Sequence, residues 1–124
     1  MMQANNPRPE PIVNVAELLG RVDNDAELLR ELIAIFKVEF PLHLCALREA
    51  VGQGNLKNVQ KLGHTLRGML ANLAAARAAA AAARLECLED SGDGAAWKSA
   101  LAFFESEVTD LLPELEACVA KARP

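Results

Sequence analysis

The chain has 124 residues, enough for one domain with a hydrophobic core and too few for a second domain of ordinary size. Apolar residues make up 52% of the sequence, but aromatic residues make up only 4% and tyrosine is absent, which disfavours a β-sheet. The net charge of −4 excludes binding of nucleic acid through the overall electrostatic field, which would repel phosphates. The composition, rich in alanine and leucine, is typical of a small all-α protein.

Cysteine usage and the N-terminus indicate a reducing compartment. Cys45, Cys87 and Cys118 are widely spaced and form no CxxC pair, so we interpret them as small buried thiols in a reducing compartment and predict neither a zinc site nor a redox dithiol. The sequence does not begin with a basic and then apolar signal, and it contains no uncharged apolar run of about 18 residues. We therefore predict a cytoplasmic protein.

The first predicted element follows a polar, proline-rich start. Residues 1–12, which begin MMQANNPRPEP, are interpreted as a flexible linker or tail, and a folded domain is predicted over residues 13–122. A short helix is predicted at about 14–21. Asn14 is its expected N-cap, with Glu17 at the capping-box position.

A long helix is predicted next, from about residue 25 to residue 51. Its apolar side chains recur at the three-and-four spacing of one buried stripe: Leu29, Leu32, Ile33, Phe36, Phe40, Leu44, Leu47 and Val51. Pro41 lies inside this pattern and should bend the helix, because proline removes one backbone donor. His43 falls in the middle of the stripe, so we interpret it as a partly buried packing residue.

Three more helices are predicted, at about 55–74, 76–90 and 95–121. The loop SGDG separates the last two, and Pro113 should bend the final helix. The helix at 76–90 is rich in alanine, and its small side chains should let neighbouring backbones approach closely. Four main helices joined by short loops predict an all-α, antiparallel up-down-up-down four-helix bundle, with the short N-terminal helix packed across one end.

His64 is placed by the periodicity of the helix predicted at 55–74. At about 100° per residue, the apolar side chains gather on one side: Val59, Leu62, Leu66, Met69, Leu70 and Leu73. His64 lies nearly opposite, on the predicted solvent face, together with Lys57, Gln60, Lys61, Arg67, Gly68 and Ala71. From Asn55 to Leu85 there are five Lys or Arg residues and no Asp or Glu, so this region is basic within an acidic chain.

Two neighbours of His64 suggest a chemical role for it. Glycine inside a helix costs roughly 1 kcal/mol relative to alanine, yet Gly68 lies one turn after His64 and leaves open space beside the imidazole. Arg67 supplies a cationic donor at the edge of that space, suited to an anion such as phosphate. Histidine, gap and positive charge together favour a phosphoryl acceptor, and an exposed histidine without a role is the alternative.

The stretch HTLRGMLANLAAAR resembles the phosphoacceptor motif of histidine-containing phosphotransfer (HPt) domains of multistep two-component phosphorelays, roughly His-x-x-Lys-Gly followed by small residues. The upstream DNDAELLRELIAIFKVEFPLHLCALREAVGQGNLKNVQKLG is similar to the long helix, proline and loop that precede this motif, so the resemblance covers about residues 14–120. Arg67 stands where lysine is usual, which keeps the charge and changes the geometry. Met69 and Leu70 stand where small residues are common, and Ala74 where glycine is frequent.

The resemblance implies a phosphocarrier and not an enzyme. Nε2 of His64 would accept a phosphoryl group from a receiver-domain aspartate and pass it to another receiver. The chain would need no cofactor, because the Mg²⁺ belongs to the receiver, and neither a metal cluster nor a glycine-rich nucleotide loop occurs in the sequence. Arg67 would stabilise the phosphate oxygens, and Gly68 would make room for them.

The resemblance also implies partners for His64. Glu86, 22 positions further on, matches the carboxylate or amide that commonly accepts a hydrogen bond from Nδ1 of the histidine in this family. An ordinary solvated glutamate at a helix end is the alternative. The residues expected to meet a receiver lie on the face of His64: Lys57, Gln60, Lys61 and Ala71.

Two other functions stay open on the sequence alone. One is the phosphoacceptor hairpin of a sensor kinase, in which an acidic residue follows the histidine and a proline comes soon after; here Thr65 follows His64, and no proline occurs between His64 and Pro113. The other is a degenerate HPt fold that binds receivers as an adaptor without phosphotransfer. The proline-rich start is similar to a tether, which favours the C-terminal module of a hybrid sensor kinase that is monomeric when isolated and makes no direct membrane contact.

Overall fold

The computed structural model describes residues 10–90 and 94–122, and all regular elements in these ranges are α-helices. The helices are α1 (Val15–Arg21), α2 (Ala26–Gln53), α3 (Leu56–Asn72), α4 (Ala76–Glu86), α5 (Gly94–Val108) and α6 (Leu111–Lys121). The predicted all-α class is confirmed. Within the described residues, no helix combines the length and the apolarity that crossing a bilayer requires.

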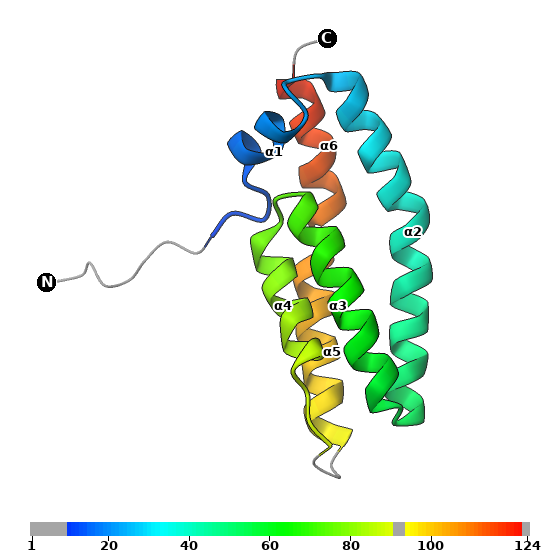
Figure 1. Cartoon of the computed structure of the whole chain (residues 1–124). Coiled ribbons are helices and arrows are strands. Elements are labelled where there is room, and N and C mark those ends of the chain that lie inside the picture. Colours follow the sequence, from blue (N-terminus) through cyan, green and yellow to red (C-terminus); the bar gives the residue numbers. More distant parts are fainter. Residues whose placement is uncertain (1–9, 91–93, 123–124) are drawn as a thin grey trace, which may run out of the picture.

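The long helices lie side by side and reverse direction from one to the next, with α6 continuing the line of α5 (Figure 1). α3 packs between α2 and α4, α4 also packs on α5, and α2 contacts both α5 and α6. α1 is held near the α3–α4 turn, because the Asn14 amide donates to Ala74 O at 2.9 Å and Arg21 Nη1 donates to Ala71 O at 2.8 Å. The histidine helix therefore has a packed neighbour on each side.

Side-chain caps begin three of the helices. The predicted cap at Asn14 is present, since its Oδ1 accepts from the Glu17 amide at 3.1 Å. Asp25 caps α2 in the same way, and Asn55 caps α3 by accepting from the Asn58 amide at 3.1 Å. Each cap satisfies an amide that has no partner within its helix.

Left-handed residues end α2 and α3. Gly54 ends α2 with a φ of +68°, which glycine adopts without steric cost. α3 ends at Asn72, two residues before the predicted end, because Ala74 has a φ of +57° and the Ala75 amide donates back to Leu70 O at 3.1 Å. Both ends use the same type of reversed C-terminal turn.

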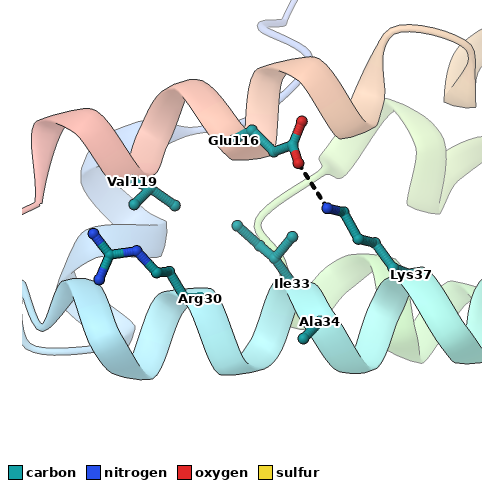
Figure 2. Close-up of a pocket in the computed structure, with 6 residues that line it drawn as sticks. All are labelled: Arg30, Ile33, Ala34, Lys37, Glu116 and Val119. Carbon is teal, nitrogen blue, oxygen red and sulfur yellow. Dashed lines mark ion pairs between the residues drawn. The ribbon is translucent and has the colours of Figure 1, made fainter.

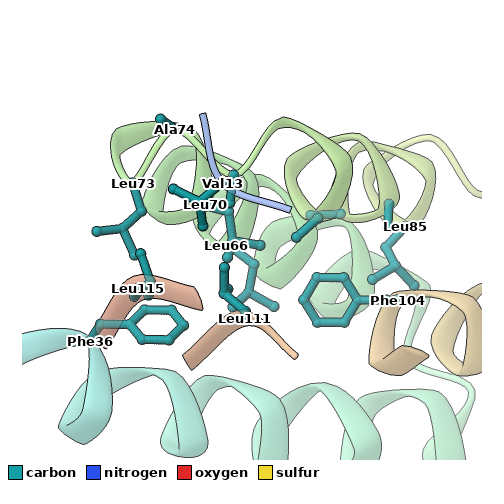
Figure 3. Packing of buried hydrophobic residues seen from close by; sticks show 14 of the residues in the cluster. Val13, Phe36, Leu66, Leu70, Leu73, Ala74, Leu85, Phe104, Leu111 and Leu115 are labelled. Carbon is teal, nitrogen blue, oxygen red and sulfur yellow. The ribbon is translucent and has the colours of Figure 1, made fainter. Parts of the chain in front are cut away.

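One hydrophobic core joins all six helices. Figure 3 shows side chains converging on it from different helices, among them Phe36 of α2, Leu66 of α3, Phe104 of α5 and Leu111 of α6. Among the described residues, no polar or charged side chain is buried in this core. The predicted apolar stripe of α2 is buried or partly buried throughout, which confirms that stripe.

The cysteines differ in part from their prediction as buried thiols. Cys118 is buried, but Cys45 and Cys87 are exposed. Cys45 lies outside the apolar stripe of α2, and Cys87 follows the last residue of α4, so neither side chain reaches the core.

The final helix differs from its prediction. The sequence predicted one bent helix at about 95–121, but the structure has two, α5 and α6, separated at Thr109 and Asp110. Pro113 explains the break, because it has no amide to donate to Thr109 O and its ring crowds that carbonyl. By contrast, α2 runs unbroken through Pro41, whose side chain is exposed and faces water.

α4 ends at Glu86, earlier than the predicted residue 90. The carbonyls beyond its end are bound by side chains and not by helical amides: Gln60 Nε2 donates to Leu88 O at 2.7 Å, and Trp97 Nε1 donates to Glu89 O at 3.1 Å. These bonds draw the chain out of the helix. The first three residues of the predicted loop SGDG lie outside the described residues.

The predicted linker is described only at its end. Residues 1–9 lie outside the described residues. Glu10 O accepts a hydrogen bond from Arg77 Nη1 at 3.3 Å, and Ile12 packs against the core. Two residues of the segment predicted as linker, Glu10 and Ile12, therefore contact the domain.

Two adjacent phenylalanines test the core. Phe104 is fully buried, so Phe104→Ala should lower the free energy of unfolding by about 3–5 kcal/mol. Phe103 is 40% exposed and stacks under Arg84, so Phe103→Ala should cost about 1 kcal/mol or less. Urea unfolding of both variants measures the difference, and equal losses would contradict this packing.

Candidate functional site

His64 lies in the middle of α3 on its outer surface. Its side chain is 66% exposed, which agrees with the solvent face predicted by periodicity. The core side of the same helix is occupied by Val59, Leu66 and Leu70, all fully buried. By comparison, His43 is half-buried on α2, with Nε2 3.8 Å from a carboxylate oxygen of Glu39. Of these two imidazoles, only that of His64 is presented largely to solvent.

Glu86, the last residue of α4, meets the imidazole of His64. Its Oε2 lies 2.7 Å from Nδ1 of His64, although the two residues are 22 positions apart and belong to different helices. The Glu86 side chain is 27% exposed and therefore partly shielded from water. The structure thus brings together the two residues that the family resemblance paired.

The contact selects one tautomer of the neutral ring. An ionised carboxylate only accepts hydrogen bonds, so a 2.7 Å contact requires Nδ1 of His64 to carry the proton and donate it to Glu86. Nε2 then carries the lone pair. Arg67 Nη2 lies 3.1 Å from Nδ1, but both groups are N–H donors in this tautomer, so the guanidinium and the ring meet through the carboxylate and not through each other.

Arg67 is bound to Glu86 as well. Its Nε donates to Oε1 of Glu86 at 2.6 Å, and Nη2 lies 3.4 Å from Oε2. The sequence predicted a cation at the edge of an open space, and the structure adds that this guanidinium is already paired with a carboxylate. Each oxygen of Glu86 therefore has its own principal donor, Arg67 on one and His64 on the other.

This arrangement shifts the pKa values of Glu86 and Arg67. The hydrogen bond from Arg67, followed by that from His64, lowers the pKa of Glu86 below its usual value, and partial desolvation opposes this only in part. The same bond to Glu86 raises the pKa of Arg67. Glu86 is therefore ionised at neutral pH and remains so in moderately acidic solution.

Gly68 leaves the predicted gap. A Cβ built on this residue would find no atom within 4 Å, and the residue is exposed. Because Gly68 follows His64 by four positions, the open space lies one helical turn along the same face. A ligand attached to the ring could extend over this part of α3 without steric conflict.

The other predicted residues surround this centre unequally. Lys57 and Lys61 are exposed on the turns before His64, and Ala71 is exposed about two turns after it. Gln60 is half-buried, and its amide is committed to Leu88 O. The structure therefore leaves the two lysines and Ala71 accessible to a partner, while Gln60 mainly ties α3 to the chain beyond α4.

One residue near the site was missed by the sequence reasoning. Gly63 directly precedes His64 and is buried against α4, where a Cβ would lie 2.8 Å from the Glu86 backbone nitrogen. The available signal was a glycine on the core side of a helix that faces an alanine-rich neighbour, although helical periodicity does not show where two backbones meet.

A groove of about 390 Å³ lies between α2 and α6, away from this site. Figure 2 shows its lining residues, of which Lys37 and Glu116 form an ion pair. Its lining residues are Arg30, Ile33, Ala34, Lys37, Glu116 and Val119. None of these is a predicted site residue. In the described part of the chain, no group of three or more His, Cys, Asp or Glu side chains is placed to hold a metal ion.

The site therefore consists of an exposed imidazole with a carboxylate at Nδ1 and open space at Gly68 one turn along, on a helix packed between two others. The Hpt domain family model matches residues 31–121, and the chain belongs to this family. Hpt domains are histidine-containing phosphotransfer modules of two-component signalling, which act as phosphocarriers and interact with receiver domains. No curated protein and no solved structure matched the chain in the comparisons.

The Arg67–Glu86 pair can be tested by titration. Because the folded-state pKa of Glu86 is lowered, the pair stabilises the fold above the usual carboxyl pKa, and this contribution is lost as pH falls through the lowered value. Arg67→Gln should move the titration midpoint of the Glu86 carboxyl carbon, followed by NMR, to higher pH. Arg48→Gln, which removes a 2.6 Å pair with Glu105 elsewhere, should leave that midpoint unchanged. An equal midpoint in all three proteins would contradict the described pairing.

Proposed function

We propose that the chain is a phosphorelay intermediate in which His64 accepts a phosphoryl group from a receiver-domain aspartate and passes it to another receiver. The main support is the 2.7 Å contact of Nδ1 with Glu86 on a ring that is 66% exposed. The contact leaves the lone pair on Nε2, and the exposure leaves that atom within reach of a docked partner. The family match supplies the chemical class.

The transfer step moves no proton. The Nε2 lone pair attacks phosphorus, the bond from phosphorus to the aspartyl oxygen breaks, and its electron pair leaves with the receiver carboxylate. The imidazole then carries the phosphoryl group on Nε2 and its proton on Nδ1, and so one positive charge, which the Glu86 carboxylate offsets at 2.7 Å. In the second transfer a receiver carboxylate attacks phosphorus, and the nitrogen–phosphorus electron pair returns to Nε2.

The remaining site residues act around this step. Gly68 leaves room for the phosphoryl oxygens on the surface of α3. Arg67 holds Glu86 and places a positive guanidinium beside the ring, where it attracts the phosphoryl group electrostatically. The partner receiver supplies the Mg²⁺ that neutralises its own acidic site. In this proposal the chain supplies no ATP site and is phosphorylated only by a receiver.

The architecture and context are part of the same proposal. Residues 13–122 would form an antiparallel up-down-up-down four-helix bundle, with α5 and α6 together as the fourth member, supported by the packing of α3 between α2 and α4. Residues 1–12 would link this domain to a preceding receiver in a hybrid sensor kinase, which places it in the cytoplasm beside a membrane-bound protein. The isolated domain would be monomeric.

One observation favours a second candidate function. Arg67 is paired with Glu86, so its guanidinium is not free to bind phosphoryl oxygens directly. This pairing favours an adaptor that binds receivers through the same surface without phosphotransfer. The two functions differ in one product, phosphohistidine. A direct search for that product decides between them.

Phosphorylation of the full chain is the first test. Incubation with a phosphorylated receiver should add one phosphoryl group by intact-mass measurement, and the adduct should survive base and disappear in mild acid. His64→Gln should carry no adduct, whereas His43→Gln, which changes the half-buried histidine of α2, should retain it. ATP alone should leave the mass unchanged.

Two outcomes would contradict the transfer proposal. An adduct that persists in His64→Gln would place the acceptor elsewhere. Receiver binding without an adduct, across the receivers encoded near this chain, would leave the adaptor function as the better account.

The exposed lysines generate a second prediction. Lys57→Ala with Lys61→Ala should slow association with an acidic receiver roughly threefold to tenfold at low salt and weaken the salt dependence, because both charges lie on the face of His64. Stopped-flow measurement of association checks this. Lys98→Ala with Lys121→Ala removes the same total charge from α5 and α6 and should have little effect, and equal slowing by both pairs would argue against a localised basic surface.

A further inference from the structure

Gly63 lies where α3 packs against α4. Of the described glycines, it makes the closest approach to a neighbouring element. A Cβ built on it would lie 2.8 Å from the Glu86 backbone nitrogen, 3.1 Å from Ala82 O and 3.1 Å from Leu85 Cβ. Two of these three atoms belong to the backbone of α4, so a rotamer change cannot relieve the overlap. Any side chain at residue 63 would have to move α4 away from α3.

The atom nearest to this Cβ belongs to Glu86, the residue whose carboxylate contacts Nδ1 of His64. Displacement of the Glu86 backbone carries its carboxylate with it, and that carboxylate makes the 2.7 Å contact with Nδ1 and the 2.6 Å contact with Arg67 Nε. Hydrogen bonds weaken steeply as they lengthen and lose alignment. Glu86 is the last residue of α4, and beyond it the chain leaves the helix after the backbone bonds of Cys87 and Leu88.

Among the described helical glycines, Gly63 is the one at which a side chain would disturb helix packing. Glycine is a poorer helix former than alanine, and α4 consists largely of alanine. A Cβ on Gly20, Gly52 or Gly68, the other described glycines within helices away from a first residue, would find no atom within 4 Å. At Gly63 alone among these does the missing side chain permit close helix packing.

We propose that Gly63 is a positioning residue of the phosphoacceptor site: its lack of a side chain sets the α3–α4 spacing at which Glu86 reaches Nδ1 of His64. The inference rests on the proposed function, in which that contact prepares Nε2 for transfer. It goes beyond that function by assigning the tautomer of His64 to a buried backbone contact as well as to the Glu86 carboxylate.

The direct test measures the tautomer without any partner. In the unphosphorylated domain labelled with ¹⁵N-histidine, at a pH where titration shows the ring to be neutral, Nδ1 of His64 should resonate as a pyrrole-type nitrogen and Nε2 as a pyridine-type nitrogen. Gly63→Ala should move the two resonances toward each other. Gly52→Ala, the same substitution in a helix with open space around it, should leave them unchanged.

Transfer kinetics give the second readout. Gly63→Ala should slow phosphoryl transfer from the receiver roughly tenfold to a hundredfold, as expected when a reacting group is misplaced by up to about an ångström. If Gly63 acts through Glu86, the double variant Gly63→Ala with Glu86→Gln should be no slower than Glu86→Gln alone. Residues that act independently would instead multiply their effects.

Each opposite result overturns the assignment. Unchanged histidine resonances in Gly63→Ala, or multiplicative effects in the double variant, would mean that Gly63 does not act through Glu86. Loss of cooperative unfolding in Gly63→Ala, with Gly52→Ala intact, would mean that the contact serves the whole fold. If no receiver phosphorylates the unmodified protein, the proposed function fails, while the histidine resonances still decide the role of Gly63.

Discussion

The carboxylate of Glu86 is the interaction on which the site depends. It accepts hydrogen bonds from Nδ1 of His64 at 2.7 Å and from Nε of Arg67 at 2.6 Å, so one side chain of α4 orients two side chains of α3. Without this anchor, an imidazole that is 66% exposed would rotate and exchange its proton between two nitrogens. The carboxylate converts an ordinary surface histidine into an oriented one.

The packing of α3 against α4 makes this interaction possible. Alanines fill much of α4, and Ala78, Ala81 and Ala82 are buried on it. Small side chains keep the two helix axes close, and Gly63 allows the backbones to meet directly beside the site. The composition that first looks like low complexity therefore has a geometric use, because a larger residue on either surface would separate the donor from its acceptor.

Helical periodicity predicted most of the helices and which of their faces are buried. The apolar stripe of α2 and the exposed position of His64 follow from a repeat of 3.6 residues, and the cap at Asn14 follows from local chemistry. Helix ends were less predictable, because they depend on tertiary hydrogen bonds such as that from Gln60 to Leu88 O. The break before Pro113 was predicted only as a bend, since sequence alone does not weigh a lost hydrogen bond against the pull of the core.

The site was predictable where it lies on one helix and less so where two helices meet. His64, Arg67 and Gly68 share a face of α3 that a helical wheel shows directly. Glu86 entered only through the family resemblance, because no periodicity relates residues on different helices. The pairing of Arg67 with Glu86 is visible only in the three-dimensional structure, since a helical wheel shows the direction of a side chain and not its partner on another helix.

The hydrogen-bonded centre of the site is contained in a single helical hairpin, between Gln60 and Leu88. The other helices support that hairpin, and in the described part of the chain none of them contributes an atom to the hydrogen bonds among His64, Arg67 and Glu86. The outer surfaces of α2, α5 and α6 are therefore open to change toward new binding specificities while the hydrogen-bonded centre stays the same. Such modularity would allow a single chemical device to be reused in many separate signalling circuits.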